Sequence, residues 1–180
     1  MAGGCLEPEA ELACGDVRLA LLADHHLEPL RAACAEDPDI WEIYPHSMLG
    51  EHFDTAIAGR KATPGVMFAA CLGEEVVGIT SYLRPDPANG VVEIGGTYIA
   101  PRVRGTSYNR TMKKLLIKHA FACGYERIAF LVDERNSRSQ AAVLKLGATR
   151  EGMLRRDRIT WTGHLRNTCV FGLLREEWTG

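Results

Sequence analysis

The stretch VVEIGGTYIAPRVRGTSYNR, residues 91–110, decides the fold of this chain. Its first ten residues are mostly apolar or small, as in a β-strand, and the run TMKKLLIKHAFACG (111–124) has helical periodicity. The junction RVRGTSYNR holds three arginines, a glycine and several hydrogen-bonding residues, more than a solvent-facing connection needs. A helix that begins directly after a strand offers free backbone N–H groups and the positive end of its dipole. We therefore expect this junction to hold an anion.

The segments around this junction alternate between strand and helix patterns. Helical spacing is found in residues 24–35, 106–123 and 136–147, with further helical patches between 37 and 59. Strand patterns occupy residues 17–22, 65–72, 75–83, 91–100 and 126–133, and a C-terminal hairpin turns around Thr162 and Gly163. The helix over 106–123 joins the strands over 91–100 and 126–133, which indicates that these two strands are parallel. The pattern predicts an α/β fold with a central twisted mixed sheet, mostly antiparallel, flanked by helices on both faces.

The length and composition indicate one soluble domain. The chain has 180 residues, of which 46% are hydrophobic and 24% charged, which is ordinary for a globular protein. We expect residues 1–15 to form a loosely ordered tail and residues 16–180 to form the domain. No apolar run approaches a membrane span, and the acidic N-terminus lacks the order of a signal peptide, so a cytoplasmic protein is expected. Six scattered cysteines without a CxxC pair argue against a metal site and against a disulfide framework.

The charges are divided unevenly between the two halves of the chain. Residues 1–100 carry 5 Lys and Arg against 16 Asp and Glu, a net −11, whereas residues 101–180 carry 16 against 7, a net +9. One interpretation is a polyanion bound on one side of the domain and a cation on the other. The alternative is that the two sets of charges interleave once the chain is folded.

The loop residues narrow the kind of anion that is expected. Gly105 lets the backbone turn and approach a ligand closely, because it has no Cβ. The amides of residues 104–109 can then surround a pyrophosphate, to which the arginines add charge. Charge-assisted hydrogen bonds contribute roughly 1.5–3 kcal/mol each, so three or four would hold it. The motifs GxGxxG and GxxxxGK[ST] are absent, so neither of these two nucleotide-binding loops is supported.

This loop resembles that of the GNAT acyltransferase superfamily, which follows the pattern [RQ]-x-x-G-x-[GA]. Here the loop reads RVRGTS over residues 102–107, and Ser107 departs from the pattern at its last position. The segments EIGGTYIAP, VDERNSRSQ and KLGATREGMLRR resemble the branch that acetylates ribosomal-protein N-termini (RimJ/RimL-like). The resemblance extends over residues 16–178 and implies the GNAT fold, with acetyl-CoA as the donor and no metal.

The resemblance also implies where acetyl-CoA binds. The strand that ends at residue 100 would pair through its backbone with the pantetheine arm, and the following loop would hold the pyrophosphate. Lys113 or Lys114 would lie near the adenosine phosphates, and the helix after residue 135 would contact the thiol end. The implied cofactor-binding residues are Tyr98, Ile99, Ala100, Arg104, Gly105, Thr106, Ser107, Tyr108, Asn109, Asn136 and Ser139.

In the implied reaction an amine attacks the thioester directly, within a ternary complex, and the CoA thiolate leaves. Glu93 is the candidate base, because it is the only carboxylate within VVEIGGTYIA. By period two it should share a strand face with Gly95, Thr97 and Ile99. Ser139 would protonate the thiolate, and an amide of the same strand would stabilise the developing oxyanion.

Each of these residues also has a structural interpretation. Glu93 can be a paired carboxylate, and Asn136 and Ser139 can cap or decorate the start of a helix. Trp41 and Tyr44 are candidates to line the acceptor site in the resemblance, but core packing explains them equally well.

The acceptor is limited by the basicity of its amine. An α-amine with a pKa near 7.7–8 is roughly a tenth neutral at pH 7, whereas a lysine near 10.4 is neutral in well under roughly a thousandth of molecules. A weak base such as Glu93 therefore suits the α-amine of a peptide or protein, or a small amine. Some members of the branch carry a glutamate where this chain has Arg158, and strand alternation should turn the adjacent Asp157 the other way. This departure weakens the transfer of the ribosomal-protein substrate.

Two other functions stay open at this stage. A catalytically idle acyl-CoA sensor would keep the loop but lack turnover, and a nucleic-acid-binding domain would use the basic C-terminal half. The arginines are spread over loop, helix and hairpin without interleaved exposed aromatics, which disfavours nucleic acid. The apolar run CVFGLL (169–174) is a candidate surface for a homodimer.

Overall fold

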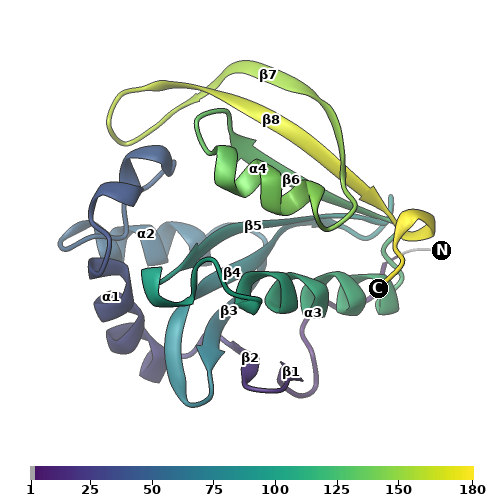
Figure 1. Ribbon diagram of the computed structural model, residues 1–180, viewed down its shortest axis with the longest axis horizontal. Coiled ribbons are helices and arrows are strands. Elements are labelled where there is room, and N and C mark those ends of the chain that lie inside the picture. Colours follow the sequence, from purple (N-terminus) through teal and green to yellow (C-terminus); the bar gives the residue numbers. More distant parts are fainter. Residues whose placement is uncertain (1–2) are drawn as a thin grey trace.

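A computed structural model describes residues 3–180 as one eight-stranded sheet with helices on both faces (Figure 1). The strand order is β1-β2-β3-β4-β5-β6-β8-β7, and each described pair is antiparallel except β5 and β6, which are parallel. The predicted fold class is therefore confirmed. The strands are β1 (Leu12–Cys14), β2 (Val17–Leu21), β3 (Gly65–Leu72), β4 (Glu75–Asp86), β5 (Val91–Ile99), β6 (Arg127–Asp133), β7 (Thr149–Ile159) and β8 (Leu165–Leu174).

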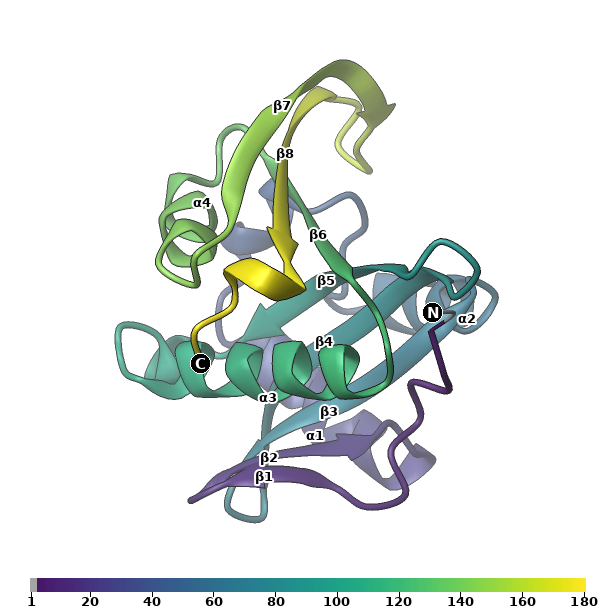
Figure 2. The ribbon, with the colours of Figure 1, turned by 90° about the vertical axis from the view of Figure 1, so that its right-hand side faces the viewer.

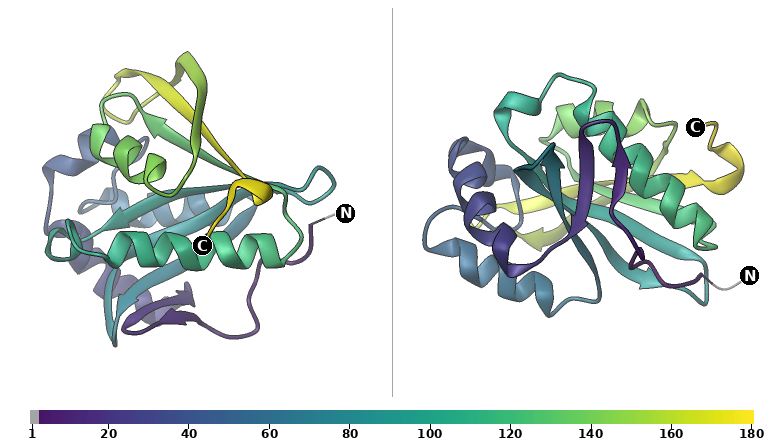
Figure 3. Two further views of the ribbon diagram at one scale, coloured as in Figure 1. Left: turned by 45° about the vertical axis from the view of Figure 1, so that its right-hand side comes forward. Right: turned by 90° about the horizontal axis from the view of Figure 1, so that it is seen from below.

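The helices divide the core into two layers. One cluster of buried side chains joins the sheet to α1 (Leu27–Ala35) and α2 (His52–Lys61), and a second joins it to α3 (Tyr108–Ala122) and α4 (Ser137–Leu144). The left view of Figure 3 shows α3 in front of the sheet and α1 and α2 behind it. A 3₁₀ turn, Asp39–Ile43, connects α1 to α2. The helices begin and end within a few residues of the positions that the sequence predicts.

The sheet opens between β5 and β6, which are the only parallel pair among the strands of residues 3–180. β5 and β6 are paired only from Val91 to Glu93 on β5, opposite Arg127 to Ala129 on β6. Beyond that point the two strands diverge, as Figure 2 shows. Among the described residues, 94–99 of β5 therefore have no strand partner on the β6 side, and the sheet has a split along this half of β5.

A β-bulge on β5 changes which residues face each side of the split. Ser81 of β4 is opposite Gly95, but Ile79 is opposite Tyr98, so β5 carries one extra residue there. Gly96 has φ +58°, a left-handed conformation that favours glycine. The expectation that Glu93 shares a face with Thr97 and Ile99 is therefore wrong.

The two faces of β5 are identified by the partners of its side chains. Glu93 shares its face with Ile79 and Tyr98, on the side of α1 and α2. The side chain of Thr97 turns to the α3 side instead, where its Oγ1 lies 2.8 Å from Oγ1 of Thr80.

The β7–β8 hairpin reaches back over the split to the segment between α1 and α2. At its tip, the indole N–H of Trp161 donates to the Trp41 carbonyl over 2.8 Å, and the Trp161 amide donates to the Pro45 carbonyl over 3.0 Å. β8 lies between β6 and β7, so its apolar run is interior to the sheet rather than at an edge. The exposed large apolar side chains of this hairpin belong to β7 and the tip instead: Met153, Leu154, Ile159, Trp161 and Leu165.

The first fifteen residues were expected to be loosely ordered. Residues 12–14 form β1 against β2, and Leu6 is only 4% exposed. The amide of Gly4 donates to the Cys123 carbonyl over 2.6 Å. Residues 1 and 2, part of the same expected tail, lie outside the described residues.

The six cysteines are unpaired, and no helix within 3–180 is both long and apolar enough to cross a membrane.

Candidate active site

The loop after β5 has the geometry of an anion site. Gly105 has φ +76°, and a Cβ built on it would meet nothing within 4 Å, so the space beside it is open. α3 begins at Tyr108, directly after the loop. The amides of Gly105, Thr106, Ser107 and Asn109 form no hydrogen bond with other described residues. They are free to bind an anion at the positive end of the helix.

The loop arginines are oriented differently from the prediction. The Arg102 guanidinium pairs with Glu36 and with Glu75, and that of Arg104 pairs with Asp37 and donates to the Ile99 carbonyl over 2.9 Å. These carboxylates come from the acidic half of the chain, so at this loop the two sets of charges interleave. The amides and the helix dipole, rather than these two side chains, carry the attraction for an anion.

The side chains of the two predicted tyrosines, Tyr98 and Tyr108, pack in the core instead of facing the anion site. Tyr98 and Tyr108 are almost fully buried, and their hydroxyls donate to the carbonyls of Ala33 (2.7 Å) and Cys71 (3.1 Å). The Tyr108 amide is already bound to Thr106 Oγ1 at 3.1 Å. The side chains at these two positions are therefore not available to a ligand, and neither is the Tyr108 amide.

The two lysines of α3 do not lie at the loop. The Lys113 amine points into the layer between α3 and the sheet, and burial lowers its pKa to about 7. The Lys114 amine donates to the Gly180 carbonyl over 2.8 Å, at the far end of the chain. The expectation that either lysine approaches the adenosine phosphates is therefore not supported by their positions.

Glu93 lies where β5 and β6 separate, with its side chain 10% exposed. It is paired with Arg84 of β4, and a Cβ on Gly95 would lie 2.6 Å from its Oε1, so the carboxylate is folded over that glycine. Burial raises the pKa of the Glu93 carboxyl, and the charges of Arg84, Arg158 and Arg166 oppose this rise without cancelling it. A carboxylate of raised pKa is a stronger base than an ordinary glutamate.

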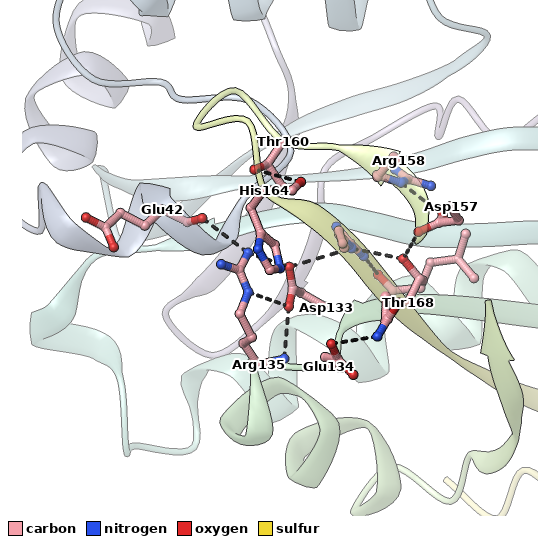
Figure 4. A network of polar contacts seen from close by, with 12 residues as sticks. Glu42, Asp133, Glu134, Arg135, Asp157, Arg158, Thr160, His164 and Thr168 are labelled. Carbon is pink, nitrogen blue, oxygen red and sulfur yellow. Dashed lines mark hydrogen bonds and ion pairs between the residues drawn. The ribbon is translucent and has the colours of Figure 1, made fainter. Parts of the chain in front are cut away.

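A polar network connects the end of β6 to the hairpin (Figure 4). Asp133 accepts hydrogen bonds from the Arg135 amide (2.9 Å), Nε (3.0 Å) and Nη2 (2.8 Å). Burial acts to raise the pKa of Asp133, but these bonds and the charge of Arg166 outweigh it and hold the pKa below its ordinary value. Arg135 also donates to the Glu42 carbonyl over 3.3 Å, so the network braces the α1–α2 segment against β6.

Asp157 belongs to this network, contrary to the prediction that it turns away. Three residues of β7, from 155 to 157, lie opposite one residue of β8, so strand alternation fails there. Asp157 Oδ1 accepts from the Thr168 hydroxyl over 2.6 Å, and its Oδ2 pairs with Arg158 Nε at 3.1 Å. Asp157 and Arg158 are therefore neighbours on the side of Arg166.

Asn136 and Ser139 lie at the start of α4, across the split from β5. Asn136 Oδ1 accepts the Ser139 amide over 2.9 Å, which is an N-cap. The Ser139 hydroxyl forms no hydrogen bond with a described residue, and the residue is partly buried. Asn136 therefore has the structural role, while the Ser139 hydroxyl is free for chemistry.

The two aromatic candidates on the acceptor side differ. Trp41 is fully buried, stacks on Tyr98 with 4.8 Å between ring centroids and donates to the Cys34 carbonyl over 3.1 Å. It is a core residue in this structure. Tyr44 is partly buried, and its hydroxyl donates to the Thr97 carbonyl on the split side of the bulge over 2.7 Å. Tyr44 therefore remains at the wall of the site.

Sequence patterns did not identify three of the groups around the split. Arg60 of α2 donates to the Gly96 carbonyl over 2.9 Å, and Arg84 pairs with Glu93. Ser81, opposite Gly95, has a fully buried hydroxyl without a hydrogen-bond partner among residues 3–180. All three come from strands or helices distant in sequence from the loop, so no local motif marks them.

These features fit acetyl-CoA. The free amides beside Gly105 suit a pyrophosphate, and the unpaired half of β5 suits an extended arm with amide groups. The orphaned Ser81 hydroxyl is buried on β4, opposite Gly95 of the same strand β5. No group of three or more His, Cys, Asp or Glu side chains within residues 3–180 is arranged to hold a metal ion. A parallel strand pair that opens beside an anion-binding helix start defines the class of acyl-CoA-dependent transferases.

Known proteins agree with this class. Residues 16–149 match the family described as Acetyltransferase (GNAT) domain. A probable GNAT acetyltransferase from Chromobacterium violaceum has TM-score 0.92 and 30% identity, over 100% of this chain and 93% of that one. A putative acetyltransferase from T. thermophilus has TM-score 0.86 and 34% identity, over 96% and 92%. Mycobacterium smegmatis RimJ, solved in complex with CoA-disulfide, shares the fold with TM-score 0.80 and 18% identity, over 100% and 93%.

The chain belongs to the GNAT family of acetyltransferases. It is an enzyme that uses acetyl-CoA as its acetyl donor, as the resemblance of its loop and strands predicts.

Proposed function

We propose that the protein acetylates a primary amine, either the α-amine of a peptide or protein or the amine of a small molecule, by direct attack within a ternary complex. The observation that carries this proposal is the position of Glu93, a buried carboxylate of raised pKa at the opening of the split. An attacking amine must lose a proton, and a carboxylate at this place accepts it directly or through one water. We expect the reaction to take place in the cytoplasm.

The other residues of the split have complementary roles in this proposal. Acetyl-CoA supplies a thioester that is activated toward an amine. The amides after Gly105 bind its pyrophosphate, and the Ile99 amide, which faces away from β4, orients its pantetheine arm. Ser139 donates its hydroxyl proton to the departing thiolate and regains a proton from solvent. Tyr44 fixes the carbonyl of Thr97 and so the shape of the bulge on the acceptor side.

A screen for CoA release tests the proposal. The purified protein is incubated with acetyl-CoA and separate α-amino peptides, amino acids, polyamines and aminoglycosides, and free thiol is followed over time. Amine-dependent thiol release with an acetylated product supports the proposal. Acetyl-CoA binding by calorimetry without release toward any amine would instead indicate an acyl-CoA sensor. Binding to nucleic acid with steep salt dependence, and none to acetyl-CoA, would indicate the third function.

A further inference from the structure

Arg60 lies in the last turn of α2, with its guanidinium against the bulge of β5. Its Nη1 donates to the Gly96 carbonyl over 2.9 Å, and a Cβ on Gly96 would collide with that same nitrogen. The side chain is partly buried, and burial lowers the pKa of the guanidinium, which nevertheless stays charged. Arg60 therefore holds a positive charge beside the split.

The charge of Arg60 has no acidic partner within residues 3–180, whereas three other arginines near the split have one. Around the split, Arg84 pairs with Glu93, Arg104 pairs with Asp37, and Arg158 pairs with Asp157. No carboxylate lies within 4.0 Å of Arg60 in this part of the chain, and only one of its five N–H donors is bound there. A desolvated charge is normally paired, so this guanidinium is poised to receive an anion.

The charge of Arg60 acts on two nearby side chains. Burial lowers the pKa of the His46 imidazole, and the charges of Arg60 and Arg158 lower it further, which favours neutral His46. Tyr44 stands beside the same charges: burial raises its pKa to about 12 against the opposing charges of Arg104, Arg60 and Arg138. Glu93 is the base expected on the same face of β5.

The base and the unpaired cation lie over neighbouring residues. Glu93 folds over Gly95 and Arg60 contacts Gly96, both on the side of α1 and α2. A ligand that extends from Glu93 along the bulge therefore reaches Gly96, where Arg60 lies. A guanidinium binds a carboxylate with two parallel hydrogen bonds, which fixes the orientation of such a ligand.

We propose that Arg60 is the anion-binding residue of the acceptor site, and that the acceptor is an amine with a carboxylate a few bonds from the amino group. Free amino acids and peptides that begin with Asp or Glu share this chemistry. The inference rests on the proposed acetyl transfer and specifies its substrate class.

The test compares acceptors that differ only in that charge. Free amino acids are compared with their α-carboxamides, and amidated peptides that begin with Glu are compared with those that begin with Gln. For each pair the ratio of kcat/KM, acid over neutral, is measured for the wild type, Arg60→Gln and Arg60→Lys. Because differences in amine pKa are the same for each enzyme, they cancel when the ratios are compared. The first pair detects the α-carboxylate and the second detects a side-chain carboxylate.

We expect Arg60→Gln to lower the ratio of at least one pair by about tenfold or more, and Arg60→Lys to retain part of it. Lys61→Gln, the adjacent substitution on the same helix, should leave both ratios unchanged. Unchanged ratios in a folded Arg60→Gln protein that still binds acetyl-CoA would overturn the assignment, as would a wild type that acetylates only amines without a carboxylate.

A binding arm separates this inference from the proposed transfer. The amino acid and its amide are titrated calorimetrically into the wild type and Arg60→Gln in the presence of CoA. A carboxylate preference lost in Arg60→Gln supports the anion site even where no thiol is released, whereas equal binding of acid and amide by the wild type contradicts it.

Discussion

The Lys113 amine lies 2.5 Å from the Thr97 hydroxyl, on the face of β5 opposite to that of Glu93. Burial lowers the pKa of this lysine to about 7, whereas an unfolded lysine has a pKa of about 10.4. Between these values the unfolded chain binds more protons than the folded one, so this residue makes the protein more stable as the pH rises from about 7 to about 10. Lys113→Met removes that dependence.

We therefore compare the free energy of unfolding of Lys113→Met with that of the wild type. The gain in stability of the variant over the wild type should be largest near pH 6 and should decrease toward pH 9. Urea unfolding at three pH values measures it. Lys114→Met is the matched control, because the Lys114 amine lies at the Gly180 carbonyl, and its difference from the wild type should change little with pH. A difference that is equally flat for Lys113→Met would show that this amine is not desolvated.

Gly105→Val is expected to abolish acetyl-CoA binding while leaving the fold intact. The residue has φ +76° and no neighbour within 4 Å of an added Cβ, so the side chain would occupy the space that the free amides face. Loss of even one charge-assisted hydrogen bond weakens binding by about tenfold or more. Calorimetry with acetyl-CoA measures this, and circular dichroism checks the fold. Gly163→Val, also at positive φ but in the hairpin turn, is the control for backbone strain. Normal affinity in Gly105→Val would exclude this loop as the pyrophosphate site.

The sequence predicts the elements and their order well, because hydrophobic periodicity and turn residues are local properties. The strand over 65–72 and the parallel pairing of β5 with β6 are confirmed. What the sequence misses depends on register and on pairing at long range. Consecutive glycines at 95 and 96 permit a bulge, but only pairing with β4 reveals that the faces of Glu93 and Thr97 differ.

The same reason explains the errors at individual charged residues. A lysine on a helix is usually solvated, but Lys113 is buried, because its amine donates a hydrogen bond to the Thr97 hydroxyl. Arg102 binds Glu36, 66 positions away, and Arg104 binds Asp37, 67 positions away. No sequence pattern at the loop indicates these partners. Arg60 was not recognised for the same reason, since only the folded chain brings it to Gly96.

Asn136→Ala should destabilise the protein by about 1 kcal/mol, because it removes the acceptor that caps α4. Asn136→Asp keeps an oxygen for the Ser139 amide and should retain most of the stability. Chemical denaturation of the two variants measures this difference. If acetyl-CoA affinity falls equally in both, the Asn136 amide group contacts the cofactor in addition to capping the helix; if neither variant loses stability, the cap is not important.

Ser139→Ala should lower kcat by about a hundredfold with little change in stability, because the hydroxyl has no hydrogen bond among the described residues to lose. The proton it donates would be needed only when the thiolate leaves, so KM for acetyl-CoA should change little. Ser139→Thr, which keeps the hydroxyl, is the control. Full turnover by Ser139→Ala would show that Ser139 has no catalytic role and serves only as a residue of the first turn of α4.

Glu93→Gln should remove one ionisation from the pH profile of the reaction. Burial raises the pKa of Glu93 above that of an ordinary glutamate, and the base acts only when ionised. In the wild type, log kcat/KM plotted against pH should rise with slope two below the pKa of Glu93. In that range a rise in pH increases both the ionised fraction of Glu93 and the neutral fraction of the amine. Above it the slope should be one, up to the pKa of the amine. Glu93→Gln should show slope one throughout, with kcat/KM lowered by about a hundredfold or more at pH 7.

Arg84→Gln moves the same ionisation and so distinguishes a base from a structural carboxylate. Arg84 opposes the rise in the pKa of Glu93, so its loss should raise that pKa further and shift the change of slope to higher pH. At a pH well above the shifted value, Arg84→Gln should approach the rate of the wild type, because Glu93 is again ionised. A profile that loses activity uniformly at all pH values in Arg84→Gln, or one that keeps slope two in Glu93→Gln, would assign the proton transfer to another group.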